Sequence, residues 1–226
     1  MNRKIIDFAW PLAMLVIATA LIALTNADLS ISTLFYQRNG WPTGNLPPWR
    51  QLYLFGYYPA YILGGTALGL YLADLSGLRK SCLKKAAAYM VVLLLLGPGL
   101  LINSGFKDHW GRERPRDISQ FGGTKSFQQP WQPGAGHGRS FPSGHGASAF
   151  YLAMPFFILR RHRPRTAALV YVAGMFYGVL MGFARIAQGG HFASDILWAW
   201  GVVHLTAVVL YYLMGLDRDP PCPDRP

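Results

Sequence analysis

The chain has 226 residues, of which 52% are hydrophobic and 14% are charged. Soluble domains carry about 25% charged residues, so this composition argues against a disordered chain and against an ordinary soluble enzyme. The 21 Lys and Arg residues against 10 Asp and Glu residues give a net charge of +11. We exclude nucleic acid as a partner because the basic residues lie between long apolar runs, as they do in membrane proteins.

Six segments are long and apolar enough to cross a bilayer, which takes about 20 helical residues each. Their apolar residues are continuous rather than alternating, which makes transmembrane strands a poor alternative. We therefore predict an all-α fold, a bundle of six transmembrane helices. The six segments lie near residues 6–26, 51–73, 84–104, 144–160, 166–184 and 195–215. Within the third segment, Gly97-Pro98-Gly99 predicts a kink.

The positive charges of the short loops predict which side of the membrane each loop occupies. Basic residues cluster at 79–85 and at 160–165, and two more precede the first segment. The positive-inside rule then places both termini in the cytoplasm. The opposite side holds the loops near 27–50, 105–143 and 185–194. We expect one membrane domain over residues 1–216 and a short cytoplasmic tail over 217–226.

The first outer loop is predicted to contain a short interfacial helix. Asp28 is placed to cap this helix, and Ile31, Leu34 and Phe35 follow at helical spacing. The two cysteines of the chain stand in no metal-binding or redox spacing, so we expect no disulfide framework.

Three segments on the predicted outer side contain an unusual concentration of polar residues. Each lies at the outer end of a predicted span, so a bundle would bring them together at one depth. They are residues 107–115, 140–145 and 185–195. Lys107, Arg114 and Arg185 would then converge as three cations. Such convergence is repulsive unless an anion lies among them, and the planar fork of arginine suits phosphate oxygens.

The second and third segments add groups suited to phosphate chemistry. Ser143 and Gly144 open the fourth predicted helix, where free N–H groups form an anion cradle and glycine permits close approach. His191 and Asp195 are four residues apart and would share a helix face. Asp195 would hold one ring N–H and leave the other nitrogen free to attack. His145, next to the cradle, is placed to protonate a leaving oxygen.

The spacing of these residues resembles the three-part signature of the type 2 phosphatidic acid phosphatase superfamily. The first part is Lys107 with Arg114-Pro115, the second is Pro142-Ser143-Gly144-His145, and the third is Arg185 with His191 and Asp195. The superfamily includes membrane lipid phosphatases, glucose-6-phosphatases, soluble bacterial acid phosphatases and vanadium haloperoxidases. The resemblance covers the six-span plan and the region from about residue 100 to residue 200.

The resemblance implies a role for each residue of the signature. His191 would be the nucleophile that forms a phosphohistidine, Asp195 would orient it, and His145 would be the general acid that later helps to activate water. The phosphoryl oxygens would be bound by Lys107, Arg114, Ser143, Gly144 and Arg185. Ala184 stands where the family often has a serine, which affects the fine tuning of the phosphate site rather than the activity.

No metal and no other cofactor is expected at this site. A two-metal hydrolase would need more carboxylate or histidine ligands than this region offers. Asp108 and His109 are the alternative metal ligands, although a solvated or packed position explains them better. Arg112 and Arg116 are equally consistent with contact to a second phosphate or a lipid headgroup and with simple solvation.

We expect an integral-membrane phosphatase that acts on the phosphomonoester or diphosphate of a phospholipid or glycolipid in the outer leaflet. The alternatives are a lipid phosphotransferase with the same site and a non-catalytic lipid-binding protein, whereas six spans argue against a haloperoxidase. Residues 103–123 are similar to bacterial lipid A phosphatases of the superfamily. This likeness favours a lipid A phosphate as substrate and the bacterial inner membrane as location, with the site facing the periplasm. Undecaprenyl diphosphate, phosphatidylglycerol phosphate and phosphatidate are further candidates, and the oligomeric state is open.

Overall fold

The computed structural model describes residues 3–38, 40–78, 82–134, 136 and 138–218. These residues fold mainly into helices, and the β-pairing among them is limited to three isolated bridges. The all-α prediction is therefore confirmed. The long helices are α1 (Arg3–Leu24), α4 (Tyr58–Leu75), α9 (Pro164–Ala187) and α10 (Ala193–Leu213). The shorter helices include α2 (Ala27–Thr33), α3 (Trp49–Phe55), α7 (Gly144–Tyr151) and α8 (Pro155–Leu159).

Within the described residues, four helical segments are long and apolar enough to cross a membrane. Three of them are α1, α9 and α10. The fourth, Lys84–His109, joins α5 (Lys84–Leu94), a π-helix (Leu95–Phe106) and α6 (Lys107–His109) without interruption. These four segments correspond to the first, third, fifth and sixth predicted spans.

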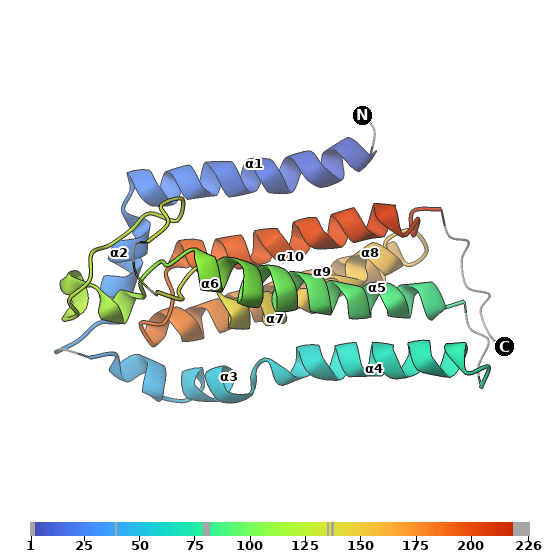
Figure 1. Ribbon diagram of the computed structural model, residues 1–226, viewed down its shortest axis with the longest axis horizontal. Helices are drawn as coiled ribbons and strands as arrows, with labels where there is room; N and C mark the ends of the chain where they lie inside the picture. The colour runs from blue at the N-terminus through green and yellow to red at the C-terminus, as the bar shows by residue number, and fades with distance from the viewer. Residues whose placement is uncertain (1–2, 39, 79–81, 135, 137, 219–226) are drawn as a thin grey trace.

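The second and fourth predicted spans are each divided into two helices. Pro59 lies in the first turn of α4, and Pro155 is the first residue of α8. Proline suits a helix start because its backbone torsion is fixed and it has no N–H to donate, and for the same reason it interrupts a longer helix. Figure 1 shows α3 followed by α4 along the length of the bundle. An apolar run alone does not reveal such a break.

The predicted kink at residues 97–99 takes the form of a π-helix that contains Pro98. Proline cannot donate to the helical ladder, and a wider turn accommodates the missing hydrogen bond. The carbonyl of Pro98 accepts the side-chain amide of Asn103 at 2.8 Å. The helix then continues to Lys107, which brings this lysine to the start of α7.

Two glycines allow α9 to pack closely against the α7–α8 region. A Cβ atom added at Gly174 would lie 2.4 Å from the backbone nitrogen of Ala153, and one added at Gly178 would lie 2.2 Å from the ring of Phe150. The residues of α7 that face neighbouring helices, such as Ala147 and Ala149, are fully buried. Close packing of this kind tolerates no added side-chain volume, so the helix ends that carry the polar segments are held firmly.

Figure 1 shows that α1 begins and α10 ends at one end of the bundle, whereas α2 lies at the other end. The connections from α5 through α6 to α7 and from α9 to α10 also lie at the α2 end. The three polar segments therefore gather there, as the order of the predicted spans requires.

A buried ion pair fastens α1 to the rest of the bundle at the opposite end. The guanidinium of Arg160 donates to Asp7 twice, from Nη1 to Oδ1 at 2.9 Å and from Nη2 to Oδ2 at 2.5 Å. The hydroxyl of Tyr212 donates to Oδ2 of Asp7 at 2.6 Å. The sequence places Arg160 among the exposed loop charges, but the structure leaves it only 6% exposed because α1 supplies the opposite charge.

Cys82 is disulfide-bonded, although the spacing of the two cysteines led us to expect no disulfide framework, because spacing along the chain says nothing about distance in space. Cys222 lies outside the described residues. The tail predicted over residues 217–226 is described only as far as residue 218.

The Asp7–Arg160 pair predicts a large effect of a single substitution. Asp7→Ala leaves the guanidinium buried without its carboxylate, and we expect a loss of unfolding free energy of about 3 kcal/mol. Thermal or denaturant unfolding in detergent micelles would measure the change. Arg218→Gln is the control, because it breaks an exposed pair with Asp217 at the same end of the molecule and should leave stability unchanged. Equal stability of both variants would contradict the assigned role.

Candidate active site

The three polar segments meet around one cavity of about 710 Å³ at the α2 end of the bundle. Five of the eight predicted site residues line it: Lys107, Arg114, His145, Arg185 and His191. Gly144 lines a smaller cavity of about 180 Å³, to which Lys107 and His145 also contribute. The remaining two, Ser143 and Asp195, are fully buried and line neither cavity.

Three cations converge on the cavity with part of their hydrogen-bonding capacity unused. The Nε atoms of Arg114 and Arg185 are buried and have no hydrogen-bond partner among the described residues. Burial lowers the pKa of Arg114, and the charge of Arg116 lowers it further. A Cβ atom at Gly144 would lie 2.7 Å from Nζ of Lys107, so only glycine lets this amine reach the start of α7. An anion in the cavity would meet three positive charges.

Glycines of the third segment hold Arg185 in place. A Cβ atom at Gly190 would lie 2.5 Å from Nη2 of Arg185, so the backbone passes directly beside the guanidinium. Arg185 also donates to the side chain of Gln188. The backbone N–H of Arg116 donates to the carbonyl of Gly189 at 3.1 Å and so joins the first segment to the third.

Ser143 starts α7 instead of facing the cavity. Its Oγ accepts the backbone N–H of Gly146 at 3.2 Å, and its own N–H donates to the carbonyl of Asp195 at 3.2 Å. The resemblance implied that Ser143 binds the phosphoryl oxygens, and the structure shows that its hydroxyl oxygen caps this helix. Its contribution to an anion site is the helix N-terminus that it stabilises at Gly144.

His191 contacts a backbone carbonyl that the sequence did not predict, in addition to its predicted partner Asp195. Its Nδ1 lies 2.7 Å from the carbonyl oxygen of Ser140 and 3.6 Å from Oδ2 of Asp195. The expectation of a shared helix face was wrong because α10 begins only at Ala193, and Asp195 instead caps that helix by accepting the N–H of Phe192 at 2.8 Å. A hydrogen bond from Nδ1 to a carbonyl leaves Nε2 without a proton, as a nucleophile requires.

Two tyrosines that the sequence did not predict as site residues enclose His145. The ring of Tyr53 stacks on the imidazole at a centroid distance of 5.2 Å, and the ring of Tyr57 meets it edge-on at 5.6 Å. The same Tyr53 ring lies 4.5 Å from the guanidinium carbon of Arg185. Both rings pack against the imidazole and hold it beside the cavity. Their position just before and after the break between α3 and α4 was not visible in the apolar pattern.

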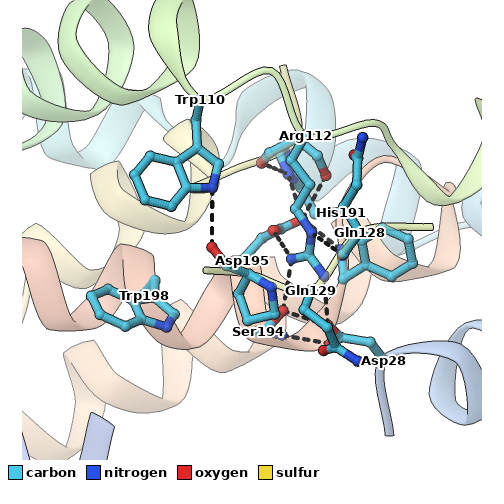
Figure 2. A network of polar contacts seen from close by, with 12 residues as sticks. Asp28, Trp110, Arg112, Gln128, Gln129, His191, Ser194, Asp195 and Trp198 are labelled. Atoms are coloured by element: carbon cyan, nitrogen blue, oxygen red, sulfur yellow. Dashed lines mark hydrogen bonds and ion pairs between the residues drawn. The ribbon is translucent and has the colours of Figure 1, made fainter. Parts of the chain in front are cut away.

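Figure 2 shows the polar network behind His191. Arg112 lies between two carboxylates, with Nη1 2.5 Å from Oδ1 of Asp195 and Nη2 2.8 Å from Oδ2 of Asp28. Oδ2 of Asp195 accepts the hydroxyl of Ser140 at 2.5 Å. Asp28 was expected to cap α2, but it lies in the first turn of that helix and its side chain turns to Arg112 instead. The sequence was equally consistent with an Arg112 that contacts the substrate and with one that is solvated. The structure shows neither.

The two alternative metal ligands lie outside the cavity lining. Asp108 pairs with Arg139 at 2.8 Å, and Nδ1 of His109 lies 2.7 Å from the carbonyl oxygen of Gly105. No group of three or more His, Cys, Asp or Glu residues within the described ranges is arranged to hold a metal ion. The positions of Asp108 and His109 therefore give no support to a metal site built on them.

The surroundings of His191 predict its ionisation. Burial lowers its pKa to about 3, and the charges of Arg185 and Lys107 act in the same direction, against the Asp195 carboxylate. Because this pKa lies below the ordinary value of about 6.5, the ring stays neutral when the pH falls from 8 to 5. Nitrogen NMR of ¹⁵N-histidine-labelled protein in micelles would check this, with His191→Ala to assign the signal. The same residue should titrate near pH 6.5 in denatured protein, and a folded-state midpoint above pH 6 would contradict the prediction.

The relatives that we report from a comparison with known proteins are named as phosphatases. The chain is 36% identical over 140 residues to the lipid A 4'-phosphatase of Francisella tularensis subsp. novicida (strain U112), covering 60% of this chain and 61% of that protein. It is 34% identical over 113 residues to the lipid A 4'-phosphatase of Rhizobium leguminosarum, covering 47% of this chain and 46% of that protein. The phosphatidylglycerophosphatase B of Bacillus subtilis (strain 168) is 28% identical over 161 residues, covering 69% and 71%.

These matches are partial in length. The matched part spans 61% and 46% of the two lipid A 4'-phosphatases. A crystal structure of a transmembrane PAP2 type phosphatidylglycerolphosphate phosphatase from Bacillus subtilis aligns over 100% of both chains with a TM-score of 0.46 and 22% identity. Residues 86–219, more than half of the chain and all of the segments around the cavity that carry the signature, match the model of the PAP2 superfamily. The resemblance seen in the sequence is thereby confirmed, and the chain belongs to the PAP2 superfamily.

Proposed function

We propose that this protein is an integral-membrane lipid phosphatase. The observation that carries the proposal is the meeting of His191, His145 and three cations at one cavity, with two arginine Nε atoms left unpaired among the described residues. A phosphoryl group has the charge and the oxygen geometry that these donors require. The names of the relatives, lipid A 4'-phosphatase and phosphatidylglycerophosphatase B, support the same class of substrate.

The reaction proceeds in two displacements at phosphorus. Nε2 of His191 attacks the phosphorus atom, the bond to the lipid oxygen breaks, and His145 donates a proton to that oxygen as it leaves. The three equatorial oxygens of the transition state gain negative charge, which Lys107, Arg114 and Arg185 stabilise. Water then attacks the phosphohistidine while His145 takes up its proton, and inorganic phosphate leaves with His191 restored. These side chains perform every step, so the proposed reaction is independent of metal ions.

A lipid A phosphate is the proposed substrate. Arg50 and Arg116 line the cavity in addition to the three catalytic cations, and none of the described lining residues is Asp or Glu. This excess of positive charge suits a lipid that carries a second anionic group besides the phosphate under attack. Lipid A phosphates, phosphatidylglycerol phosphate and undecaprenyl diphosphate meet this condition, whereas phosphatidate does not. The lipid A 4'-phosphatase relatives favour the first of these, and the match to phosphatidylglycerophosphatase B keeps the second as the other candidate.

We also propose the placement of the chain in the membrane. The helix pairs α3–α4 and α7–α8 complete six spans, and α2 lies at the interface. The basic residues at 84–85 and 160–165 lie at the end opposite to the cavity, where the positive-inside rule expects the cytoplasm. The cavity then faces the periplasm from the inner membrane, and both termini are cytoplasmic. A lipid tail can remain in the bilayer while its headgroup enters the cavity.

A panel of lipids tests the function. Purified protein in detergent should release phosphate from lipids with two anionic groups, and His191→Ala should reduce turnover by at least about 1,000-fold because the nucleophile is lost. Wild type quenched without acid should carry an acid-labile, base-stable phosphoryl group. Arg50→Gln with Arg116→Gln should raise KM for these lipids and leave turnover of phosphatidate unchanged.

The controls for this assay separate the alternatives. EDTA should leave the rate unchanged, and loss of activity that Mg²⁺ or Zn²⁺ restores would reject the metal-independent mechanism. Transfer of labelled phosphate to a second lipid, in place of release to water, would indicate a phosphotransferase. Binding of lipid without any turnover by wild type would indicate the non-catalytic alternative.

A cysteine-labelling experiment tests the sidedness. In a background with Cys82 and Cys222 replaced by serine, Ser119→Cys should react with a membrane-impermeant thiol reagent in intact spheroplasts, because residue 119 is exposed at the cavity end. Arg163→Cys, exposed at the other end, should react only after the membrane is opened. The reverse pattern would place the cavity in the cytoplasm and require a substrate in the inner leaflet.

A further inference from the structure

Arg112 is fully buried, and its donors are directed at protein groups rather than at the cavity. Besides the two carboxylates, Nη1 donates to Oγ of Ser194 at 2.7 Å and Nε donates to the carbonyl of Gln128 at 3.0 Å. The rings of Phe127 and Phe192 lie 5.7 and 4.6 Å from its guanidinium carbon. Arg114, two residues further on, lines the cavity with its Nε unpaired. The two arginines of this segment therefore have different tasks.

The carboxylate of Asp195 connects Arg112 to His191 through Ser140. Arg112 holds Oδ1, while the hydroxyl of Ser140 and the N–H of Phe192 hold Oδ2. The carbonyl of the same Ser140 accepts Nδ1 of His191 at 2.7 Å. The orientation of the imidazole thus depends on the position of Ser140, which depends on a carboxylate that Arg112 keeps in place.

Asp28 extends this chain of contacts to α2. Its Oδ2 accepts Nη2 of Arg112 at 2.8 Å and the hydroxyl of Ser194 at 2.5 Å, and its Oδ1 accepts the backbone N–H of Ser194 at 2.8 Å. Asp28 is 2% exposed. The guanidinium is thereby held from both sides, and the start of α10 is tied to α2.

We propose that Arg112 and Asp28 are positioning residues for the nucleophile. They act through Asp195 and Ser140, and neither touches the substrate. The proposal rests on the proposed function, in which His191 attacks phosphorus. Buried charges of opposite sign hold each other in fixed geometry because either one alone would be costly to keep away from water. The helix that follows α1 is therefore part of the catalytic apparatus, although it carries no residue of the three-part signature.

Steady-state kinetics of matched variants test this role. Arg112→Gln should lower kcat about 100-fold, the cost of a nucleophile displaced by about 1 Å, with KM within about twofold of wild type. Arg112→Lys, which restores the charge, should recover part of the loss. Arg139→Gln is the matched control, because it removes an exposed arginine–aspartate pair from the same loop and should leave both parameters unchanged.

Asp28→Asn keeps the shape of the side chain and so remains informative if Arg112→Gln does not fold. It should also lower kcat, but by a smaller factor than Arg112→Gln. The double variant, with both substitutions, should be no slower than Arg112→Gln, since both substitutions act on one contact. A raised KM with unchanged kcat would make Arg112 a substrate ligand and overturn the proposal. Wild-type kinetics in folded variants would overturn it as well.

A second readout does not depend on turnover. In ¹⁵N-histidine-labelled wild type, the Nδ1–H signal of His191 should be protected from exchange with water, because the bond to Ser140 is buried. Arg112→Gln should increase its exchange at least about tenfold, whereas Arg139→Gln should not. Unchanged exchange in Arg112→Gln would reject the proposal. If wild type hydrolyses no lipid but the exchange responds as stated, the proposed function fails and the positioning role stands.

Discussion

Two buried arginines, one at each end of the bundle, determine how the N-terminal helices join the rest of the protein. Only 22% of the apolar window of α1 is buried, so apolar packing alone holds it weakly. Asp7 in α1 meets Arg160 at one end, and Asp28 in α2 meets Arg112 at the other. A buried carboxylate requires a partner, and each partner here comes from a segment more than 80 residues away. These pairs add fixed polar contacts to the interface between the N-terminal helices and the rest of the bundle.

The separation of charge around His191 also follows from the need of each buried carboxylate for a partner. Carboxylates lie behind the histidine, where Arg112 and Ser140 satisfy them, and the cations that face the cavity have no carboxylate among its described lining residues. If Asp195 paired with Arg185 instead, the cavity would lose the positive charge that an anion needs. Arg112 keeps the two sets apart, because it neutralises the acids locally and leaves the cavity positive.

The two histidines of the cavity have different surroundings, which bears on the roles that we propose for them. His191 is enclosed by backbone and cations, so burial keeps it neutral and nucleophilic. His145 lies between the rings of Tyr53 and Tyr57, which hold it beside the cavity. A nucleophile and a general acid need opposite protonation states at the same pH, so the proposed mechanism requires a proton on His145 when the phosphate is bound, and the negative charge of that phosphate favours it.

The sequence by itself determined the helical class, the polar segments at one end and five of the residues that line the cavity. The length of the apolar runs and the spacing of the polar residues are local patterns. A membrane bundle leaves few ways to arrange the helix ends that carry Lys107, Arg114, His145, Arg185 and His191. It did not determine where a proline divides a span, because an apolar run looks the same on both sides of the break. It also did not reveal the pairing of Asp28 with Arg112 or the carbonyl partner of His191. Those contacts join residues 84 and 51 positions apart, so only the packing of α2, the long outer loop and α10 decides them.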